Sequence, residues 1–548
     1  MAIIRVFAPQ FTISDLADGA NGSLMSGTAT AFNYGWTGTP GDDGMSGTGV
    51  GLTYAGTAFT GGTITSFTFR GYESTVLWSV TGLTLSATAF QSARNTYNST
   101  GSVVDLVNAL ASNTFTAYGS LANDDFHGGQ NGDNLRGDWG DDTFTGYNGA
   151  DTIVGGPAFG VNAWADDYGD DYDTVNYGRE TGLSGIVVNM TLSTGNVRDT
   201  YSAFDTLSGI EYIRGTNKAD SMRGSDTSRY EAFMGGAGND TINGGLGVDD
   251  EVRYDHETGT IGVIVNLATG VCKDSFGNTD TVTNIERVRG TARNDSITGN
   301  NSDNRFRGFA GNDTIDGGLG NDTVQYHQDA EKQSTTGAYG TSGIRVDLTA
   351  GYARDGFKTF DTLVSIEHVW ATDYLDRVVG NTSGNYFRLY DGHDFADGRD
   401  GNDTILGHDG NDSLLGGNGN DSLDGGSMAD LLVGGSGVDT LTGGRGWDTF
   451  QFVAAAATGI DVVTDFVAVD DTITIENGVF TALTAGALAA TAFVVGAAAT
   501  TAAHRIIYNQ TTGALLYDAD GTGATAAVQF ATLSSKPTGV TAADFMII

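Results

Sequence analysis

The chain has 548 residues and a formal net charge of −40, from 67 acidic and 27 basic side chains. Such an acidic chain is a poor partner for nucleic acids or anionic membranes, whose phosphates attract basic surfaces. Cys272 is the only cysteine, which excludes a disulfide within the chain. The N-terminal stretch has no basic segment followed by a long apolar run, and no uninterrupted apolar run of about 18 residues occurs anywhere. We therefore expect neither a Sec-type signal nor a transmembrane segment.

Residues 1–118 are expected to form a β-rich N-terminal domain. Polar and apolar residues alternate in TITSFTFRG, which starts at Thr63, and in TVLWSVTGLTLSATAF, which starts at Thr75. This alternation is typical of antiparallel strands, and it shifts by one residue at Gly82. The spacing of apolar residues predicts one helix over residues 103–111.

Three aromatic residues of this region, Tyr34, Trp36 and Tyr54, would suit binding of a sugar or a partner if they were exposed. Packing in the core is the alternative that we favour, because aromatic side chains bury large apolar areas. The sequence of this region therefore predicts strands but no specific ligand.

A period of nine residues occupies residues 119–156. The units are GSLANDDFH, GGQNGDNLR, GDWGDDTFT and GYNGADTIV. Each unit has aspartate at its sixth place and a large apolar residue at its eighth. The sixth places are Asp124, Asp133, Asp142 and Asp151, and the eighth places are Phe126, Leu135, Phe144 and Ile153.

Residues 157–370 contain a longer repeat in three copies. Each copy begins with an apolar strand, GIVVNM, GVIVNL or GIRVDL, and continues through a DxxxxxDT loop to an IEx[IV] strand. Nonapeptides such as GGAGNDTIN at Gly235, GFAGNDTID at Gly308 and GGLGNDTVQ at Gly317 follow. We expect a solenoid interrupted by strand-rich insertions, since stacked repeats bury a continuous core. Units with altered turns, such as GTNKADSMR and GTARNDSIT, are expected to continue the coil without a full metal site.

Residues 371–451 form an unbroken run of nonapeptides, of which GHDGNDSLL at Gly407 is representative. Glycines favour turns, and the three residues around the eighth place suit a short strand with one inward side chain. Two turns and two strands make a coil of 18 residues, and stacked coils form two parallel sheets.

This tract resembles the calcium-binding β-roll of the RTX family. The resemblance implies an all-β fold: a parallel β-roll or β-solenoid with calcium-binding nonapeptide repeats, strand-rich insertions and a β-rich N-terminal domain. It also implies that several Ca²⁺ ions are bound between successive turns.

The aspartates at the sixth place fit that expectation. Two of them that are 18 residues apart lie one coil apart, at about the 4.8 Å spacing of neighbouring strands, and would repel each other. Calcium takes six or more oxygen ligands, so carboxylates and turn carbonyls together could hold it. The pairs expected to share an ion in the unbroken tract are Asp394–Asp412, Asp403–Asp421, Asp412–Asp430, Asp421–Asp439 and Asp430–Asp448. The full set of expected ligands is Asp133, Asp142, Asp151, Asp240, Asp249, Asp313, Asp322, Asp394, Asp403, Asp412, Asp421, Asp430, Asp439 and Asp448.

Residues 452–548 depart from the period and resemble the C-terminal region of type I secreted RTX proteins, including serralysin-type proteases. The segments DVVTDF at Asp461, YDADG at Tyr517 and DFMII at Asp544 carry the resemblance. It implies a cap on the roll and the type I secretion machinery as a partner. Asp518 and Asp520 could hold a further ion, although Gln529 stands at position twelve from Asp518, where an EF-hand loop has glutamate.

No catalytic motif is evident in the sequence. HExxH and GxSxG are both absent, and the seven histidines are scattered. Acidic pairs that could serve a glycosidase are mostly explained by calcium ligation. We therefore expect a protein that is not an enzyme.

The sequence favours a secreted or cell-surface protein that folds on extracellular calcium and has a structural or adhesive role, as an S-layer, filament or matrix subunit. Its expected partners are the type I secretion machinery and either further copies of itself or a cell-surface polysaccharide, not nucleic acid. A secreted hydrolase with an unrecognised active site and a soluble glycan-binding module are the alternatives.

Overall fold

The structure is a computed structural model of the chain that divides into two compact units. Unit 1 comprises Met1–Arg253 and Gly270–Ile285, and unit 2 comprises Tyr254–Thr269 and Glu286–Ile548. Before residue 119 the structure describes the backbone of five strands. From residue 123 onward it describes all residues except 157–171, 195, 228, 248, 328–339 and 454–458. None of the helices in this described part has the length and apolar character needed to span a membrane.

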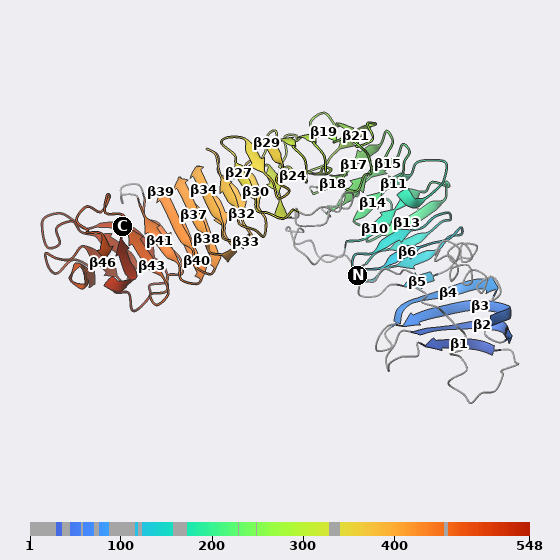
Figure 1. The fold of residues 1–548 in the computed structure, drawn as a ribbon, viewed down its shortest axis with the longest axis horizontal. Helices are drawn as coiled ribbons and strands as arrows, with labels where there is room; N and C mark the ends of the chain where they lie inside the picture. Colours follow the sequence, from blue (N-terminus) through green and yellow to red (C-terminus); the bar gives the residue numbers. More distant parts are fainter. Residues whose placement is uncertain are drawn as a thin grey trace. The chain divides into compact units, whose positions relative to one another are not determined.

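Unit 1 begins with an antiparallel sheet of four strands, shown in blue in Figure 1. The strands expected around Thr63 and Thr75 are present as β3 and β4, and their pairing shifts register between Ile64 and Ser66, opposite the stretch that contains Gly82. The four strands are β1 (Ala29–Gly35), β2 (Gly44–Ala55), β3 (Ala58–Arg70) and β4 (Val76–Ser86).

A short strand, β5 (Thr116–Tyr118), joins this sheet to the nonapeptide region. It pairs antiparallel with β4 and parallel with β7, so a single sheet runs from the N-terminal strands into the repeats. The helix expected over residues 103–111 and the side chains of the three N-terminal aromatic residues lie outside the described residues.

The nonapeptides of unit 1 form two sheets, with one strand for each repeat. The first sheet continues from β5 through β7 (Asn134–Arg136), β9 (Thr152–Val154), β13 (Phe204–Ser208), β12 (Val197–Arg198), β11 (Val187–Asn189), β15 (Ser221–Arg223), β17 (Thr241–Asn243), β21 (Thr279–Thr283) and β20 (Val271–Lys273). The second contains β6 (Asp125–His127), β8 (Thr143–Thr145), β10 (Thr174–Asn176), β14 (Tyr212–Arg214), β16 (Ala232–Met234) and β18 (Glu251–Arg253), with a 3-10 turn, η3, at Tyr177–Arg179.

Unit 2 repeats this arrangement, and its strands β34, β37, β39 and β41 lie side by side in Figure 1. Its first sheet contains β19 (Ile264–Asn266), β23 (Ser296–Thr298), β25 (Thr314–Asp316), β29 (Phe360–Val364), β28 (Tyr352–Arg354), β27 (Arg345–Asp347), β31 (Arg377–Val379), β34 (Phe395–Asp400), β37 (Ser413–Asn418), β39 (Leu431–Ser436), β41 (Thr449–Phe452), β43 (Thr472–Ile475) and β49 (Phe545–Ile547).

The second sheet of unit 2 ends in the C-terminal region. It contains β22 (Arg287–Arg289), β24 (Arg305–Arg307), β26 (Thr323–Gln325), β30 (His368–Trp370), β32 (Tyr386–Arg388), β35 (Thr404–Leu406), β38 (Ser422–Ser427), β40 (Thr440–Arg445), β42 (Asp461–Val463), β48 (Val528–Leu533), β47 (Ala514–Tyr517), β46 (Ile506–Asn509) and β45 (Phe493–Val495). The remaining short elements are β33 (Asp391–Gly392), β36 (Asp409–Gly410), β44 (Gly486–Ala487), η6 (Ala490–Ala492) and η7 (Ala542–Asp544).

The strand-rich insertions are three-stranded meanders placed inside a parallel sheet. In unit 1, β13 pairs parallel with β9 on one side and antiparallel with β12 on the other. β12 pairs antiparallel with β11, which then pairs parallel with β15. In unit 2, β29, β28 and β27 lie in the same way between β25 and β31. The expected parallel β-roll with strand-rich insertions is therefore confirmed.

The core of each roll is only one side chain thick on each sheet. The residue at the eighth place of each nonapeptide points inward and is almost fully buried, as for Leu414 and Leu423, while the residues on either side of it face outward. Each coil thus buries two large side chains, and their loss cannot be made up by deeper layers.

Two neighbouring leucines of β37 test this thin core. Replacing the buried Leu414 by alanine should lower the free energy of unfolding by about 2–5 kcal/mol, because it leaves a cavity between two coils. The same change at the adjacent, outward-facing Leu415 should have a much smaller effect. Urea denaturation in calcium measures both variants, and equal losses would contradict a core built from the eighth places alone.

Candidate metal sites

The aspartates at the sixth place form ladders along the edges of the roll. The backbone N–H of Asp394 donates to Oδ1 of Asp412 at 2.8 Å, and that of Asp403 donates to Oδ1 of Asp421 at 2.8 Å. Every pair expected to share an ion in the unbroken tract is joined in this way, one coil apart. These carboxylates are almost fully buried.

Shorter ladders run through the earlier repeats. In unit 1 they are Asp133–Asp151–Asp205, Asp124–Asp142–Asp173–Glu211 and Asp220–Asp240–Asp280. In unit 2 they are Asp295–Asp313–Asp361 and Asn304–Asp322–Glu367. The structure therefore places the expected ligands Asp133, Asp142, Asp151, Asp240, Asp313 and Asp322 in equivalent positions, although the repeats that carry them are not consecutive.

The second carboxylate oxygen of the ladder residues is the feature that indicates a cation site. In the described residues, buried Oδ2 atoms have no hydrogen-bond partner at Asp151, Asp240, Asp313, Asp322, Asp394, Asp403, Asp412, Asp421, Asp430 and Asp439. A buried carboxylate oxygen without a partner is costly, and a bound cation would satisfy it.

Glycine at the first place leaves room for that oxygen. A Cβ atom built on Gly416 would overlap Oδ2 of Asp421, and one built on Gly407 would overlap Oδ2 of Asp412. Glycine at the fourth place has a different neighbour: a Cβ on Gly419, whose φ is +139°, would overlap the carbonyl oxygen of Gly401 one coil away. Carboxylate and carbonyl oxygens thus approach the same turns, as calcium requires.

Side chains alone do not complete a metal site. Among the described residues, no three His, Cys, Asp or Glu side chains converge closely enough to hold an ion. A calcium ion between two coils would therefore take carboxylate oxygens from a ladder pair, such as Asp403 and Asp421, and further ligands from turn carbonyls. The ladder residues fit calcium, a hard cation with oxygen ligands, better than a metal that prefers nitrogen or sulfur.

Three repeats begin a ladder without such an unpartnered oxygen. At their second place threonine replaces glycine, and in GTARNDSIT the hydroxyl of Thr291 donates to Oδ1 of Asp295 at 2.9 Å while its N–H donates to Oδ2 at 2.6 Å. Thr216 binds Asp220 in the same way, and Thr372 binds Asp376. The altered turns of GTNKADSMR and GTARNDSIT thus satisfy their own aspartates.

One expected ligand, Asp249, does not lie in the ladder position. Asp249 occupies the sixth place of the unit that begins at Gly244, but the structure puts Asp250 in the ladder position, because this turn has one extra residue. Asp250 is fully buried and directly precedes β18, as Asp412 directly precedes β37. A Cβ on Gly244 would approach Oδ2 of Asp250, which repeats the contact seen for Gly416 and Asp421.

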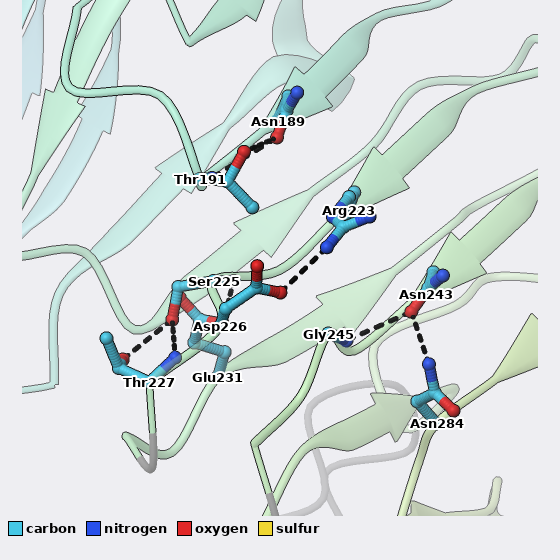
Figure 2. A network of polar contacts seen from close by, with 10 residues as sticks. All are labelled: Asn189, Thr191, Arg223, Ser225, Asp226, Thr227, Glu231, Asn243, Gly245 and Asn284. Atoms are coloured by element: carbon cyan, nitrogen blue, oxygen red, sulfur yellow. Dashed lines mark hydrogen bonds and ion pairs between the residues drawn. The ribbon is translucent and has the colours of Figure 1, made fainter.

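Glutamate takes the same role where the turn is longer still. The unit that begins at Gly224 has eleven residues, 224–234, and within it the carboxylate of Glu231 accepts the N–H of Ser225 at 2.6 Å. Figure 2 shows this wide turn, in which Arg223 also binds Asp226 at 2.7 Å. The change of period from nine to eleven residues was the sequence signal for this site.

Further ladder residues lie beyond the regular period. The N–H groups of Asp439 and Asp448 donate to Oδ1 of Asp461 and Asp471, at 3.1 Å each. These bonds span 22 and 23 residues instead of 18, so the nonapeptide pattern did not identify them. Asp518 serves a turn instead, since its Oδ1 accepts the N–H of Asp520 and of Gly521.

The loop aspartates of the meanders also close turns. Asp199 accepts the N–H groups of Tyr201 and Ala203 at 2.9 and 2.6 Å, and Asp274 and Asp355 occupy the same place in the other two copies. The DxxxxxDT motif therefore contains one turn residue and one ladder residue, of which Asp205 is an example.

Burial without a cation changes the acidity of the ladder carboxyls. Burial, followed by the neighbouring charges of Asp403 and Asp439, raises the pKa of Asp421 to about 7. Burial likewise raises the pKa of Asp394 to about 9, with the charges of Asp376 and Asp412 adding to the effect. In the absence of metal, the folded roll therefore holds protons that the unfolded chain releases.

This difference predicts that the calcium-free chain becomes less stable as pH rises. In the folded chain the pKa of Asp421 and of Asp430 is about 7, above the ordinary value of 3.8. Their protonation therefore contributes to the free energy of unfolding below pH 3.8, and this contribution is lost as pH rises through about 7. The metal-free chain should therefore show a stronger β-sheet signal by far-UV circular dichroism at pH 5 than at pH 8. With calcium the difference between the two pH values should narrow, because a cation stabilises the ionised carboxylates; a stronger metal-free signal at pH 8 would contradict the prediction.

The sequence was also compared with known proteins. The RTX calcium-binding nonapeptide repeat family (4 copies) matches residues 118–157, 232–250, 289–324, 370–423 and 424–451. No curated protein matches the chain. Among solved structures, the crystal structure of the extracellular lipase LipA from Serratia marcescens is similar over 50% of this chain and 45% of the lipase chain, with 16% identity and a TM-score of 0.15.

The chain thus spans less than half of the lipase, and so low a score carries no argument about activity. The repeat family, in contrast, matches the same turns in which the structure stacks buried aspartates. The chain therefore contains calcium-binding nonapeptide repeats of the RTX family.

Proposed function

We propose that the chain is a secreted protein with a structural or adhesive role at the cell surface, as a subunit of an S-layer, a filament or a matrix. The observation that supports this most is the series of buried, unpartnered carboxylate oxygens, which recurs through both units. Calcium bound along such a series would stabilise a long scaffold rather than serve one reaction centre.

Calcium would also decide where the chain folds. With a net charge of −40, the repeats repel themselves when calcium is scarce, as it is inside cells. Extracellular calcium modules bind with Kd values of about 10⁻⁴ to 10⁻³ M, so millimolar calcium outside the cell is sufficient. Because the ion binds the folded state, it stabilises that state through linkage.

Export by the type I machinery fits this order of events. RTX repeat proteins are typically secreted, and an unfolded chain can pass a narrow channel before it folds outside. The C-terminal segments that resemble those of type I substrates lie in strands β42 and β49 and at the end of β47, in unit 2. Our proposal assigns them two roles, recognition during export and capping of the roll afterwards.

Exposed apolar side chains on the meanders support a role in contact with other molecules. Phe204 and Val271 in unit 1 are 59% and 51% exposed, and Phe360 in unit 2 is 59% exposed. Contiguous exposed apolar patches on a protein commonly mark sites of interaction with other molecules. Self-association and binding to a surface polysaccharide are the two contacts that we propose.

Calcium removal tests the proposed folding. At pH 8 the purified chain should lack β-sheet signal by far-UV circular dichroism in chelator and gain it when millimolar calcium is added. Negative-stain microscopy in calcium should then show ordered sheets or fibres. A full β-sheet signal in chelator would refute calcium-dependent folding, and a uniform monomer in calcium would refute the assembly role.

A single ladder residue tests whether the carboxylates hold the ion. Replacing Asp421 by asparagine is compatible with the turn, since Asn385 stands at the sixth place of another repeat, where its Oδ1 accepts the N–H of Asn381 at 3.0 Å. The loss of one charge-assisted ligand, worth about 1.5–3 kcal/mol, should raise the calcium midpoint of folding by about tenfold or more. The exposed Asp409 in the same tract provides a control with the same charge change, and its asparagine variant should keep the original midpoint.

A further inference from the structure

Three arginines stand side by side on the outer face of the third meander. Arg354 on β28 lies opposite Arg345 on β27, and Arg345 lies opposite Arg377 on β31. Neighbouring strands are about 4.8 Å apart, so three positive charges follow one another across the sheet. We call Arg354, Arg345 and Arg377 the arginine row.

Nothing in the described residues neutralises the arginine row. Within the part of the chain that the structure describes, no ion pair or side-chain hydrogen bond joins any of its three guanidinium groups. Two acids on the same face have other partners: Asp347 accepts the N–H of Ala350 at 2.8 Å, and Asp397 pairs with Arg399 at 3.5 Å. Like charges directly opposite one another destabilise a sheet, so the arrangement costs stability in the absence of a ligand.

Aromatic side chains flank the row at both ends. Phe360 on β29 lies opposite Arg354 and is 59% exposed, and Tyr352 lies beside it on β28. At the other end, Phe395 on β34 lies opposite Arg377, whose guanidinium carbon is 4.1 Å from the centre of the ring. The outer face thus combines a cationic centre with apolar edges.

The fold itself does not need arginine at these places. In the first meander the corresponding row reads Phe204, Arg198, Val187 and Ser221. In the other copy, Ile264 on β19 lies opposite Ser296 on β23, at the places of Arg345 and Arg377. A meander therefore forms with Val or Ile at the place of Arg345 and Ser at the place of Arg377. The additional positive charge of the third meander requires another explanation.

We propose that the arginine row binds an acidic polysaccharide, with acidic groups of successive sugars on successive guanidinium groups. Arginine forms paired hydrogen bonds to carboxylate and to other oxyanions, and its planar group stacks on aromatic rings. A chain that bears acidic groups along its length matches a charged row that crosses parallel strands. Flanking aromatic rings suit the apolar faces of sugars.

The net charge of −40 does not prevent this contact. At physiological ionic strength the field of distant charges falls off within about 8 Å, so the groups nearest the ligand dominate. Calcium bound in the ladders would further reduce the negative field. The proposal deepens the adhesive role proposed above and rests on it.

The test compares two double variants of the full chain, each folded in calcium. Arg345→Val with Arg377→Ser copies the first meander into the third. Arg293→Ser with Arg445→Ser removes the same charge from exposed places outside the row. Calcium titration by circular dichroism of all three proteins shows first that folding is unchanged, which separates failure of this proposal from failure of calcium-dependent folding.

Binding is then measured by calorimetry with oligogalacturonates, which carry a carboxylate on every sugar, with chondroitin sulfate, which also carries sulfates, and with neutral dextran. The unaltered chain and the control variant should bind at least one acidic glycan, more weakly as salt is added, and should not bind dextran. The row variant should bind about tenfold more weakly or worse. A row variant with unchanged affinity, equal loss in both variants, or equal binding of dextran would overturn the proposal.

Two other occupants are distinguished in the same experiment. A single-stranded oligodeoxynucleotide that binds as tightly as the glycans would show a general polyanion site and overturn the assignment to sugars. Sedimentation without any glycan measures self-association. If the unaltered chain associates and the row variant does not, the occupant is a second copy of this chain, and the polysaccharide proposal is wrong.

Discussion

Buried carboxylates stacked one coil apart are the constraint on which the rest of the structure depends. Each ladder aspartate uses Oδ1 to hold the backbone of the preceding coil, as Asp421 holds Asp403, and so fixes the vertical register of the roll. In the regular turns its second oxygen lies where a Cβ at the first place would overlap it, as for Gly416 and Asp421. The glycines of the repeat are therefore needed because of its aspartates. A cation that neutralises the carboxylates lets the coils stack.

The regular part of this arrangement could be predicted because the period itself sets the geometry. A residue at the eighth place, such as Leu423, has to point inward wherever turns and strands have constant length. Prediction failed where turn length changed: Asp250 replaces Asp249 after one extra residue, and Glu231 serves a turn two residues longer. Asp461 was missed for the same reason, since its partner lies 22 residues away.

The arginine row illustrates a second limit of sequence reasoning. Arg345 and Arg377 are 32 residues apart and become neighbours only because a meander inserts three strands before the parallel sheet resumes. Spacing along the chain gives no hint of that contact. Internal repeats do help once the pairing is known, because the first meander shows what the same places contain when no extra charge is present. The repeats thus serve as their own reference for which side chains the fold requires.

The threonines at the start of the ladders have a consequence for how the roll comes apart. Asp220, Asp295 and Asp376 are held by hydroxyl and backbone donors, and each follows a meander whose strands are joined by antiparallel hydrogen bonds. When one ladder loses an ion, the unfolding of its coils should therefore stop at the next meander instead of spreading along the chain. As the calcium concentration falls, the protein should unfold one segment at a time. The unfolding caused by a proteolytic nick or a damaged repeat should stay within the segment in which it occurs.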